Sequence, residues 1–329
     1  MAEFIMKLQI LLIVALLSLL LTAQFGAVEI DLWQLVQCGW RQCENLAIEQ
    51  QIFWQIRLPR ILVGFAVGGG LALVGCILQS VTRNPLADPY LFGIVSGAGL
   101  GAVAGESLAA IWGVVIPLSL SAFVGAFMAV FAVVALNFYQ GWRRVEQVLL
   151  AGVAISFLCT AITGFLLYLQ SPYAASRIMF WLMGSLAQTD WQAVKFILPL
   201  VLVGLVAVLA LARKLDALVL SDDAVHSLGI SVVQIRLFLM ILVAAISAVI
   251  VAFCGGIGFV GLMMPHLIKR FVGNKHSILA WASILAGGSF LLWVDVFARS
   301  ILPNQEIPLG IITAAIGSIF FIGLMFKKF

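Results

Sequence analysis

The chain has 329 residues, of which 64% are hydrophobic and 10% are charged. Soluble domains carry roughly 25% charged residues, so this chain has too few charges to cover a soluble surface. Its formal net charge is only +4, and no basic run with interleaved aromatic residues occurs outside the turns between apolar segments. It therefore lacks the footprint of a nucleic-acid-binding protein.

About ten apolar segments follow one another along the chain, most of them close to the roughly 20 residues that span a bilayer as a helix. The sequence therefore predicts an all-α, polytopic membrane protein with a single transmembrane domain over residues 1–329. The predicted spans are residues 8–26, 57–80, 91–105, 112–137, 146–168, 191–212, 232–253, 257–271, 277–298 and 308–326. The third and eighth are short, so we expect them to tilt or to be held at membrane depth by neighbouring protein.

The first span resembles a secretory signal, but its apolar region is long and no small-x-small cleavage site follows cleanly. We expect a retained helix. Residues 27–56 are predicted to form an interfacial helix carrying Trp33, Trp40 and Trp54, because tryptophan anchors proteins at the headgroup level. Cys38 and Cys43 share this outer loop, where an oxidising compartment permits a disulfide, and both the bridged and the reduced forms fit the sequence.

Basic residues indicate the orientation, because loops on the cytoplasmic side are enriched in Lys and Arg. With a cytoplasmic N-terminus, 12 of the 18 Lys and Arg residues fall on the cytoplasmic side. The remaining six would lie outside: Arg41, Arg57, Arg60, Arg177, Lys195 and Arg299. This bias predicts that both termini lie in the cytoplasm, and the membrane that we expect is a bacterial inner membrane.

A glycine-dense stretch runs from Arg57 to Gly105, and in its second half Gly93, Gly97, Gly101 and Gly105 recur every four residues. A lone glycine weakens a helix by about 1 kcal/mol. Small residues four apart instead form a smooth face on which another membrane helix packs at close range. Because Leu, Val and Ile fill the gaps, we expect close packing rather than a flexible linker.

Several catalytic and nucleotide-binding motifs are absent from the sequence. It has no G-x-x-x-x-G-K-[ST] phosphate loop, no H-E-x-x-H zinc pair and no G-x-S-x-G nucleophile elbow. Its acidic residues fall in loops or at span ends, with Asp295 the deepest, whereas a proton-coupled carrier places carboxylates near the bilayer midplane. The sequence thus predicts a pathway without its own energy source, and not an enzyme.

Residues 213–231 form a polar, helix-forming connection between two predicted spans. Ser221 is a plausible N-cap, with Asp222 and Asp223 in the first turn where they favour the helix dipole, and Gly229 suits the helix end. An ordinary solvated connecting helix and a contact site for an energy-supplying partner fit this segment equally well.

Several segments together resemble the FecCD permease family, the membrane subunits of ABC importers for vitamin B12, haem and ferric siderophores. They occur in family order and cover nearly the whole chain: RLPR at 57–60, the Gly-rich run at 68–99, VLLAGVAIS at 148–156, FWLMGSLAQTDW at 180–191, SDDAVHSLG at 221–229, GGIGFVGLMMPHLIKRFVG at 255–273, DVFAR at 295–299 and EIPLGIITAAIGSIFFI at 306–322.

The resemblance implies the permease of a type II importer, a dimer with its substrate path along the dimer axis. The second permease subunit is expected to be identical. The other implied partners are two cytoplasmic ABC ATPase subunits, which bind ATP and Mg, and a periplasmic substrate-binding protein. The resemblance implies no cofactor on this chain.

The resemblance also implies an outer docking site. Arg57, Arg60 and Arg299 match a basic cluster that receives a glutamate from the binding protein, a task that suits the bidentate fork of arginine. For Arg57 and Arg60, the alternative is that each side chain snorkels to the interface at the start of a span.

On the cytoplasmic side, the resemblance implies a coupling helix and a gate. The coupling residues, which would dock on the ATPase, are Asp222, Asp223, His226 and Gly229. The gate residues are Asn84, Pro85 and Leu86, for which a simple proline turn is the alternative. Residues 141–146 would oppose the gate, although WRRVE is bulkier and more charged than expected there.

The fifth and tenth spans line the path in the family. Candidate lining residues are Phe165, Tyr168, Thr313 and Ser318, and contact with lipid or a neighbouring helix fits each of them equally well. The substrate that we expect is an iron-siderophore or haem. Cobalamin or a molybdate-type oxyanion is the alternative within this class, and a stand-alone secondary transporter is the alternative from a different class.

Overall fold

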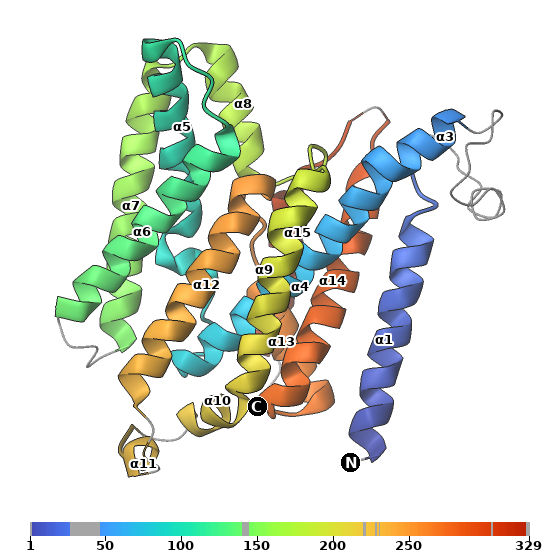
Figure 1. The fold of residues 1–329 in the computed structure, drawn as a ribbon, viewed down its shortest axis with the longest axis vertical. Helices are drawn as coiled ribbons and strands as arrows, with labels where there is room; N and C mark the ends of the chain where they lie inside the picture. Colours follow the sequence, from blue (N-terminus) through green and yellow to red (C-terminus); the bar gives the residue numbers. More distant parts are fainter. Residues whose placement is uncertain are drawn as a thin grey trace.

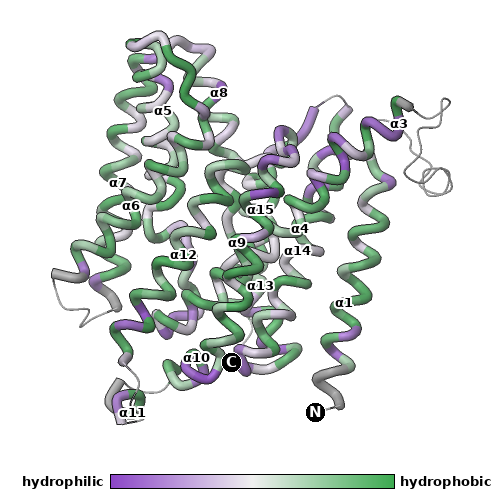
Figure 2. The backbone as a smooth tube through the Cα atoms, in the orientation of Figure 1, coloured by the Kyte–Doolittle hydropathy of each residue, from purple (hydrophilic) through white to green (hydrophobic). Residues whose placement is uncertain are grey.

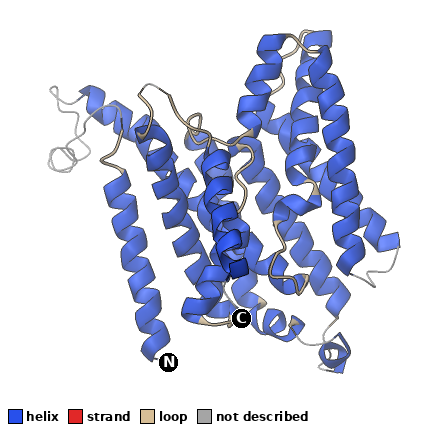
Figure 3. Cartoon of the chain, turned by 180° about the vertical axis from the view of Figure 1, so that it is seen from behind, coloured by secondary structure: helices blue, strands red, loops and turns tan. Residues whose placement is uncertain are grey.

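The computed structural model describes residues 2–26, 47–139, 145–219, 222–227, 229, 231–303 and 305–326, and within these ranges every regular element is a helix (Figure 3). The predicted all-α fold is therefore confirmed. The elements are α1 (Ala2–Thr22), α3 (Ala47–Ile52), the π-helical η2 (Phe53–Arg57), α4 (Leu58–Val81), the 3₁₀ turn η3 (Pro89–Phe92), α5 (Ile94–Trp112), α6 (Leu118–Tyr139), α7 (Val145–Leu169), α8 (Pro172–Leu182), α9 (Trp191–Ala210), α10 (Ala212–Leu218), α11 (Asp222–Ser227), α12 (Val232–Cys254), α13 (Val260–Val272), α14 (His276–Ser300) and α15 (Leu309–Phe326).

The helices stand side by side, with α1 at one edge and α5 to α8 at the other (Figure 1). Both termini lie at the same end as α10 and α11, in agreement with an even number of crossings. Hydrophilic residues gather towards the two ends of the bundle, while its middle is hydrophobic (Figure 2).

Eight helices in the described ranges are long and apolar enough to cross a membrane. They correspond to eight of the predicted spans. The apolar part of α1, Met6–Thr22, is slightly shorter than a full span, and α13 has 13 residues, or about 20 Å at 1.5 Å per residue. The prediction that the eighth segment is short is thus confirmed.

The third predicted span differs from the expectation. It is not short, because α5 has 19 residues and ends at Trp112, before Gly113 in a left-handed conformation. The fourth span consequently begins at Leu118 rather than at residue 112. The sequence prediction also missed α8, an 11-residue helix that begins with Pro172 after a Ser171 cap. Trp33, Trp40, Cys38 and Cys43 lie outside the described residues.

The most buried membrane helix is α4, with 89% of its apolar window buried inside the chain. It packs against α9, α12, α13 and α14. Its glycines permit this, because a Cβ atom on Gly68 would overlap the carbonyl oxygen of Gly287, and one on Gly75 would overlap the carbonyl oxygen of Gly261. Two helix backbones therefore touch α4 directly, as the glycine pattern predicts.

The glycines of α5 serve the same purpose against α6. A Cβ atom on Gly97 would lie 2.6 Å from the carbonyl oxygen of Gly125, and one on Gly101 would overlap that of Ser121. The predicted close-packing face is confirmed for these positions, and its partner is the next helix of the same chain. Gly93 differs, because it adopts φ 77° and joins η3 to α5.

Two non-helical segments, the turn after α8 and the link between α12 and α13, meet the first turn of α15 inside the bundle. Ser185 N donates to the Cys254 carbonyl at 2.8 Å, and Leu309 N donates to the Gly184 carbonyl at 2.8 Å. Gly310 N likewise donates to the Met183 carbonyl at 3.0 Å. These bonds satisfy irregular backbone within the protein, which is the condition for its presence at membrane depth.

The contact between α4 and α13 generates a prediction. Gly75→Ala should destabilise the fold by about 1–3 kcal/mol or more, because overpacking forces two backbones apart. The matched control is Gly164→Ala in α7, where a Cβ atom would meet nothing within 4 Å, and where alanine favours the helix by up to about 1 kcal/mol. Thermal unfolding of the two variants in detergent checks this, and equal midpoints would contradict it.

Candidate functional site

At the end of the bundle opposite the termini, Arg60 of α4 is held between two carboxylates. Its Nη2 lies 2.7 Å from Oδ1 of Asp295 in α14, and its Nε lies 3.1 Å from both oxygens of that carboxylate. Its Nη1 and Nη2 donate to Oε1 and Oε2 of Glu306, each at 2.8 Å. The guanidinium thus binds two carboxylates through its fork, the strongest geometry for such pairs.

The other two predicted docking arginines hold the end of α1. Arg57 is buried, and its Nη1 donates to the carbonyl of Ala23 at 3.0 Å. Arg299 donates to the carbonyls of Phe25 at 2.7 Å and Thr22 at 3.1 Å. Cationic side chains stabilise the C-terminal carbonyls of a helix, where the dipole is negative.

The structure therefore brings the three arginines together and corrects one alternative. Arg57 and Arg60 do not snorkel into solvent, because the first is buried against α1 and the second is paired within the chain. Arg299 also contacts Asp295, its neighbour one helical turn earlier, with Nε 3.3 Å from Oδ2. Among the described residues, the cluster contains three guanidinium groups and two carboxylates.

Glu306 is the more accessible of the two carboxylates. Its side chain is 39% exposed, compared with 4% for Asp295. The hydrogen bond from Arg60 holds the pKa of the Glu306 carboxyl below its usual range. Sequence reasoning missed both carboxylates as partners of Arg60, since 235 and 246 residues separate the pairs. The one sequence feature that singled out either carboxylate was the position of Asp295, which lies deeper in a predicted span than the other acidic residues.

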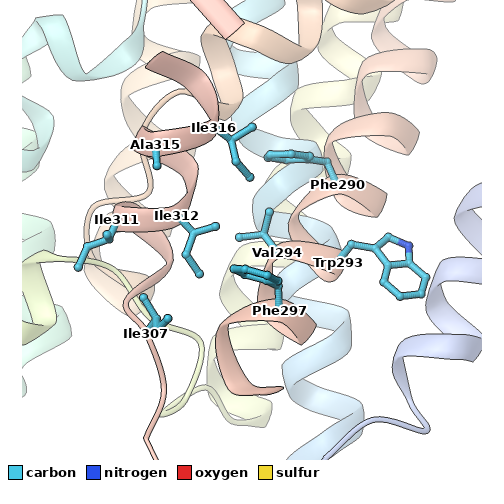
Figure 4. Close-up of a pocket in the computed structure, with 9 residues that line it drawn as sticks. All are labelled: Phe290, Trp293, Val294, Phe297, Ile307, Ile311, Ile312, Ala315 and Ile316. Carbon is cyan, nitrogen blue, oxygen red and sulfur yellow. The ribbon is translucent and has the colours of Figure 1, made fainter. Parts of the chain in front are cut away.

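An apolar cavity of about 510 Å³ lies beside the cluster, between α14 and α15 (Figure 4). Its walls are Phe290, Trp293, Val294, Phe297, Ile307, Ile311, Ile312, Ala315 and Ile316. Trp293 points toward α1, where its Nε1 donates to Oγ of Ser18 at 3.1 Å. The described residues that line the cavity include no charged side chain.

The predicted coupling segment lies at the opposite end, with the termini (Figure 1). It contains α10 and α11, and Val225 anchors α11 to the rest of the chain because it is buried. His226 is exposed in the last turn, and Gly229 follows with φ 72° and an N–H that donates to the carbonyl of His226 at 2.9 Å. The predicted helix end at Gly229 is confirmed.

Asp222 and Asp223 form the first turn of α11, as predicted. The proposed cap Ser221 lies outside the described residues.

The predicted gate residues form a compact turn directly after α4. Oδ1 of Asn84 accepts the backbone N–H of Leu86 at 2.9 Å, the bond that defines an Asx turn. Pro85 lies between them, and the Leu86 side chain is exposed. The proline turn is confirmed, while the gate role stays a prediction. Most of the opposing loop, residues 140–144, lies outside the described ranges.

The predicted lining residues divide into two groups. Phe165 and Tyr168 of α7 and Ser318 of α15 are exposed. Their helices have only 22% of their apolar windows buried, the lowest share among the candidate spans. Thr313 needs correction, because its side chain is fully buried and donates to the carbonyl of Gly310 at 3.3 Å. It lines no surface of this chain.

Comparison with known proteins gives consistent matches. The sequence pattern of the FecCD transport family matches residues 10–327. The cobalamin import system permease protein BtuC of Halobacterium salinarum is 41% identical over 276 residues, 84% of this chain and 73% of the relative. The hemin transport system permease protein HmuU of Yersinia pestis is 36% identical over 334 residues, 97% of this chain and 94% of the relative.

One solved structure resembles the whole chain. It is an inward-facing conformation of a metal-chelate type ABC transporter, with a TM-score of 0.84 and 31% sequence identity. The match covers 98% of this chain and 99% of that one.

The lowered pKa of Glu306 predicts how stability depends on pH. Its ion pair with Arg60 stabilises the fold above the unfolded pKa, and this contribution is lost as pH falls through the lower folded pKa. Because Glu306 is partly exposed, the effect should not exceed about 1 kcal/mol. The unfolding midpoint of wild type should exceed that of Glu306→Gln at pH 7 and converge with it below about pH 4. A difference that is constant with pH would contradict this.

Proposed function

Because this chain belongs to the FecCD transport family and is a permease subunit of an ABC importer, we propose that it carries a metal chelate from periplasm to cytoplasm. The proposed substrate is an iron-siderophore or haem, and ATP hydrolysis on a separate subunit drives the transport. The observation that carries this proposal is the likeness to a haem permease over almost the full length of both chains.

Cobalamin is the second candidate substrate. The 41% identity to a cobalamin permease favours it, and cobalamin is itself a metal chelate. In this class of importer, the binding protein supplies most of the selectivity, so both substrates suit the same permease fold. A molybdate-type oxyanion is smaller and has no support among the relatives described above.

The proposed assembly contains two copies of this chain, two cytoplasmic ATPase subunits and one periplasmic binding protein. It would lie in a bacterial inner membrane, with both termini and the coupling segment in the cytoplasm. Asp222, Asp223, His226 and Gly229 would contact the ATPase. The turn of Asn84, Pro85 and Leu86 would close the path at that side, and Phe165, Tyr168 and Ser318 are its candidate lining residues.

The arginine cluster would receive the binding protein on the other side. Arg60 is the member best suited to this, because its Glu306 partner is partly exposed and is a carboxylate like the incoming group. Arg57 and Arg299 bind carbonyls at the end of α1 and in the turn that follows it, so their replacement would disturb this part of the chain as well as docking. This supports Arg60 and Glu306 as the positions at which docking is tested.

The function is tested in proteoliposomes that contain the permease, its ATPase and its binding protein. Four probes are offered separately: haem, a ferric siderophore, cyanocobalamin and molybdate. We expect ATP-dependent uptake of one of the three chelates and no uptake without the ATPase. Vesicles that contain the permease alone and carry a proton gradient are the control, and uptake there would establish a secondary transporter instead.

The docking role is tested with two variants. Glu306→Gln removes the more exposed of the two carboxylates that occupy Arg60 and should tighten binding of the binding protein several-fold, since only Asp295 then competes within the chain. Arg60→Lys keeps the charge beside Asp295 but loses the bidentate fork, so it should weaken binding several-fold. Affinities are measured by surface plasmon resonance on permease in nanodiscs. Unchanged affinity in both variants would remove Arg60 from the docking site.

A further inference from the structure

Three polar side chains outside the sites above join α10, α14 and α4. Nδ1 of His276 lies 2.6 Å from Oδ1 of Asp216 in α10, and this oxygen also accepts the backbone N–H of His276 at 3.0 Å. Nε2 of the same ring lies 2.5 Å from Oγ of Ser80, in the last turn of α4. The first residue of α14 therefore bridges α10 and α4.

Each polar hydrogen atom on the side chains of His276 and Ser80 has an acceptor in this set of hydrogen bonds. A carboxylate only accepts, so Nδ1 of His276 carries a proton and donates it to Asp216. Ser80 has one hydroxyl hydrogen, shared between Nε2 of His276 and the Cys76 carbonyl, which lies 2.9 Å away on the same helix. His276 and Ser80 are buried, and hydrogen bonds in such low-dielectric surroundings are strong and polarise one another.

The order Ser–His–Asp resembles a hydrolytic triad, but the surroundings do not suit catalysis. Ser80 is only 5% exposed and lies inside α4, so no substrate carbonyl reaches its Oγ. Asp216 is the exposed member of the chain, with 41% of its side chain accessible, whereas in a triad the carboxylate is the buried one. The arrangement is therefore a structural connection.

A second bond joins α10 to the turn that follows α4. Nε of Arg83 donates to the carbonyl of Leu218 in α10 at 2.8 Å. Arg83 adopts φ 50°, a conformation that costs a non-glycine residue roughly 1–2 kcal/mol, and it directly precedes Asn84. The buried side chains of Leu215 and Leu218 anchor α10. The end of α4 that leads into the proposed gate is thus tied to α10 at two places.

We propose that His276 is a positioning residue that transmits movement of the coupling segment to the gate turn. The segment α10 ends four residues before α11 begins, and the gate turn begins three residues after α4 ends. A displacement of α11 by the ATPase would move α10, and through Asp216, His276 and Ser80 it would move the end of α4. This inference rests on the proposed function, because it assigns a connection between its two cytoplasmic sites.

The test uses the complete transporter in proteoliposomes, with whichever of the four probes the wild type transports. Asp216→Ala breaks the connection on its α10 side, where it removes both bonds from His276, and Ser80→Ala breaks it on its α4 side. We expect uptake per ATP hydrolysed to fall roughly fivefold or more, the low end of coupling between distinct sites. Binding of the ATPase and the rate of ATP hydrolysis should stay near wild type. Ser289→Ala is the matched control, since this buried serine of α14 bonds only the carbonyl one turn earlier, and it should transport normally.

The double variant separates transmission from stability. Both variants keep the Arg83 bond to α10. If the contacts of His276 with Asp216 and Ser80 act in series, breaking either one interrupts the link through His276, so Ser80→Ala with Asp216→Ala should transport no worse than the poorer single variant. Independent structural effects would instead add. Gel filtration and the unfolding midpoint confirm that each variant folds. If Ser80→Ala does not fold, Asp216→Ala alone still tests the link through His276.

Normal uptake per ATP in both single variants, or additive losses in the double variant, would overturn the role of His276 while the proposed function stands. A wild type that shows no ATP-dependent uptake would overturn the proposed function and this inference together.

Discussion

Between membrane helices the surrounding lipid is as apolar as the side chains, so association depends on close packing rather than on exclusion of water. The burial of α4 shows how far this requirement extends, because glycines place its backbone against the backbones of both α13 and α14. A helix held in this way has no lateral freedom. It therefore serves as the fixed reference from which both ends of the molecule are built, Arg60 near its start and Ser80 near its end.

The two ends use charge in different ways. At the start of α4, three guanidinium groups satisfy two carboxylates and the open carbonyls of α1. Removal of one partner from a buried ion pair is far more costly than the pair is worth, so this cluster constrains the fold, and Glu306 is its most exposed charged group among the described residues. At the other end, His276 joins α10 and α4 through short hydrogen bonds, one to the carboxylate of Asp216 and one to the hydroxyl of Ser80. The side chains proposed for docking and for transmission therefore also stabilise the fold.

The sequence predicted most of the fold, since hydrophobic length and glycine spacing are local signals. It placed all ten apolar segments on helices and identified the packing faces around Gly75 and Gly101. It misjudged the third span, because the left-handed Gly113 ends α5 later than the apolar pattern suggests, and it missed α8, which is amphipathic and short. The partners of Arg60 and His276 could not be predicted, because Asp295, Glu306 and Asp216 are brought to them only by tertiary packing.

The break before α13 has a consequence for biosynthesis. This helix is too short to cross the bilayer unaided and ends in Lys269 and Arg270. The turn after α8 that pairs with the break also bonds to Leu309 and Gly310 at the start of α15, which the ribosome makes after both α8 and α13. The nascent chain therefore cannot complete this region one helix at a time. Until α15 is made, part of the membrane-depth backbone lacks its hydrogen-bond partners, so this region is completed only when α15 joins the earlier helices.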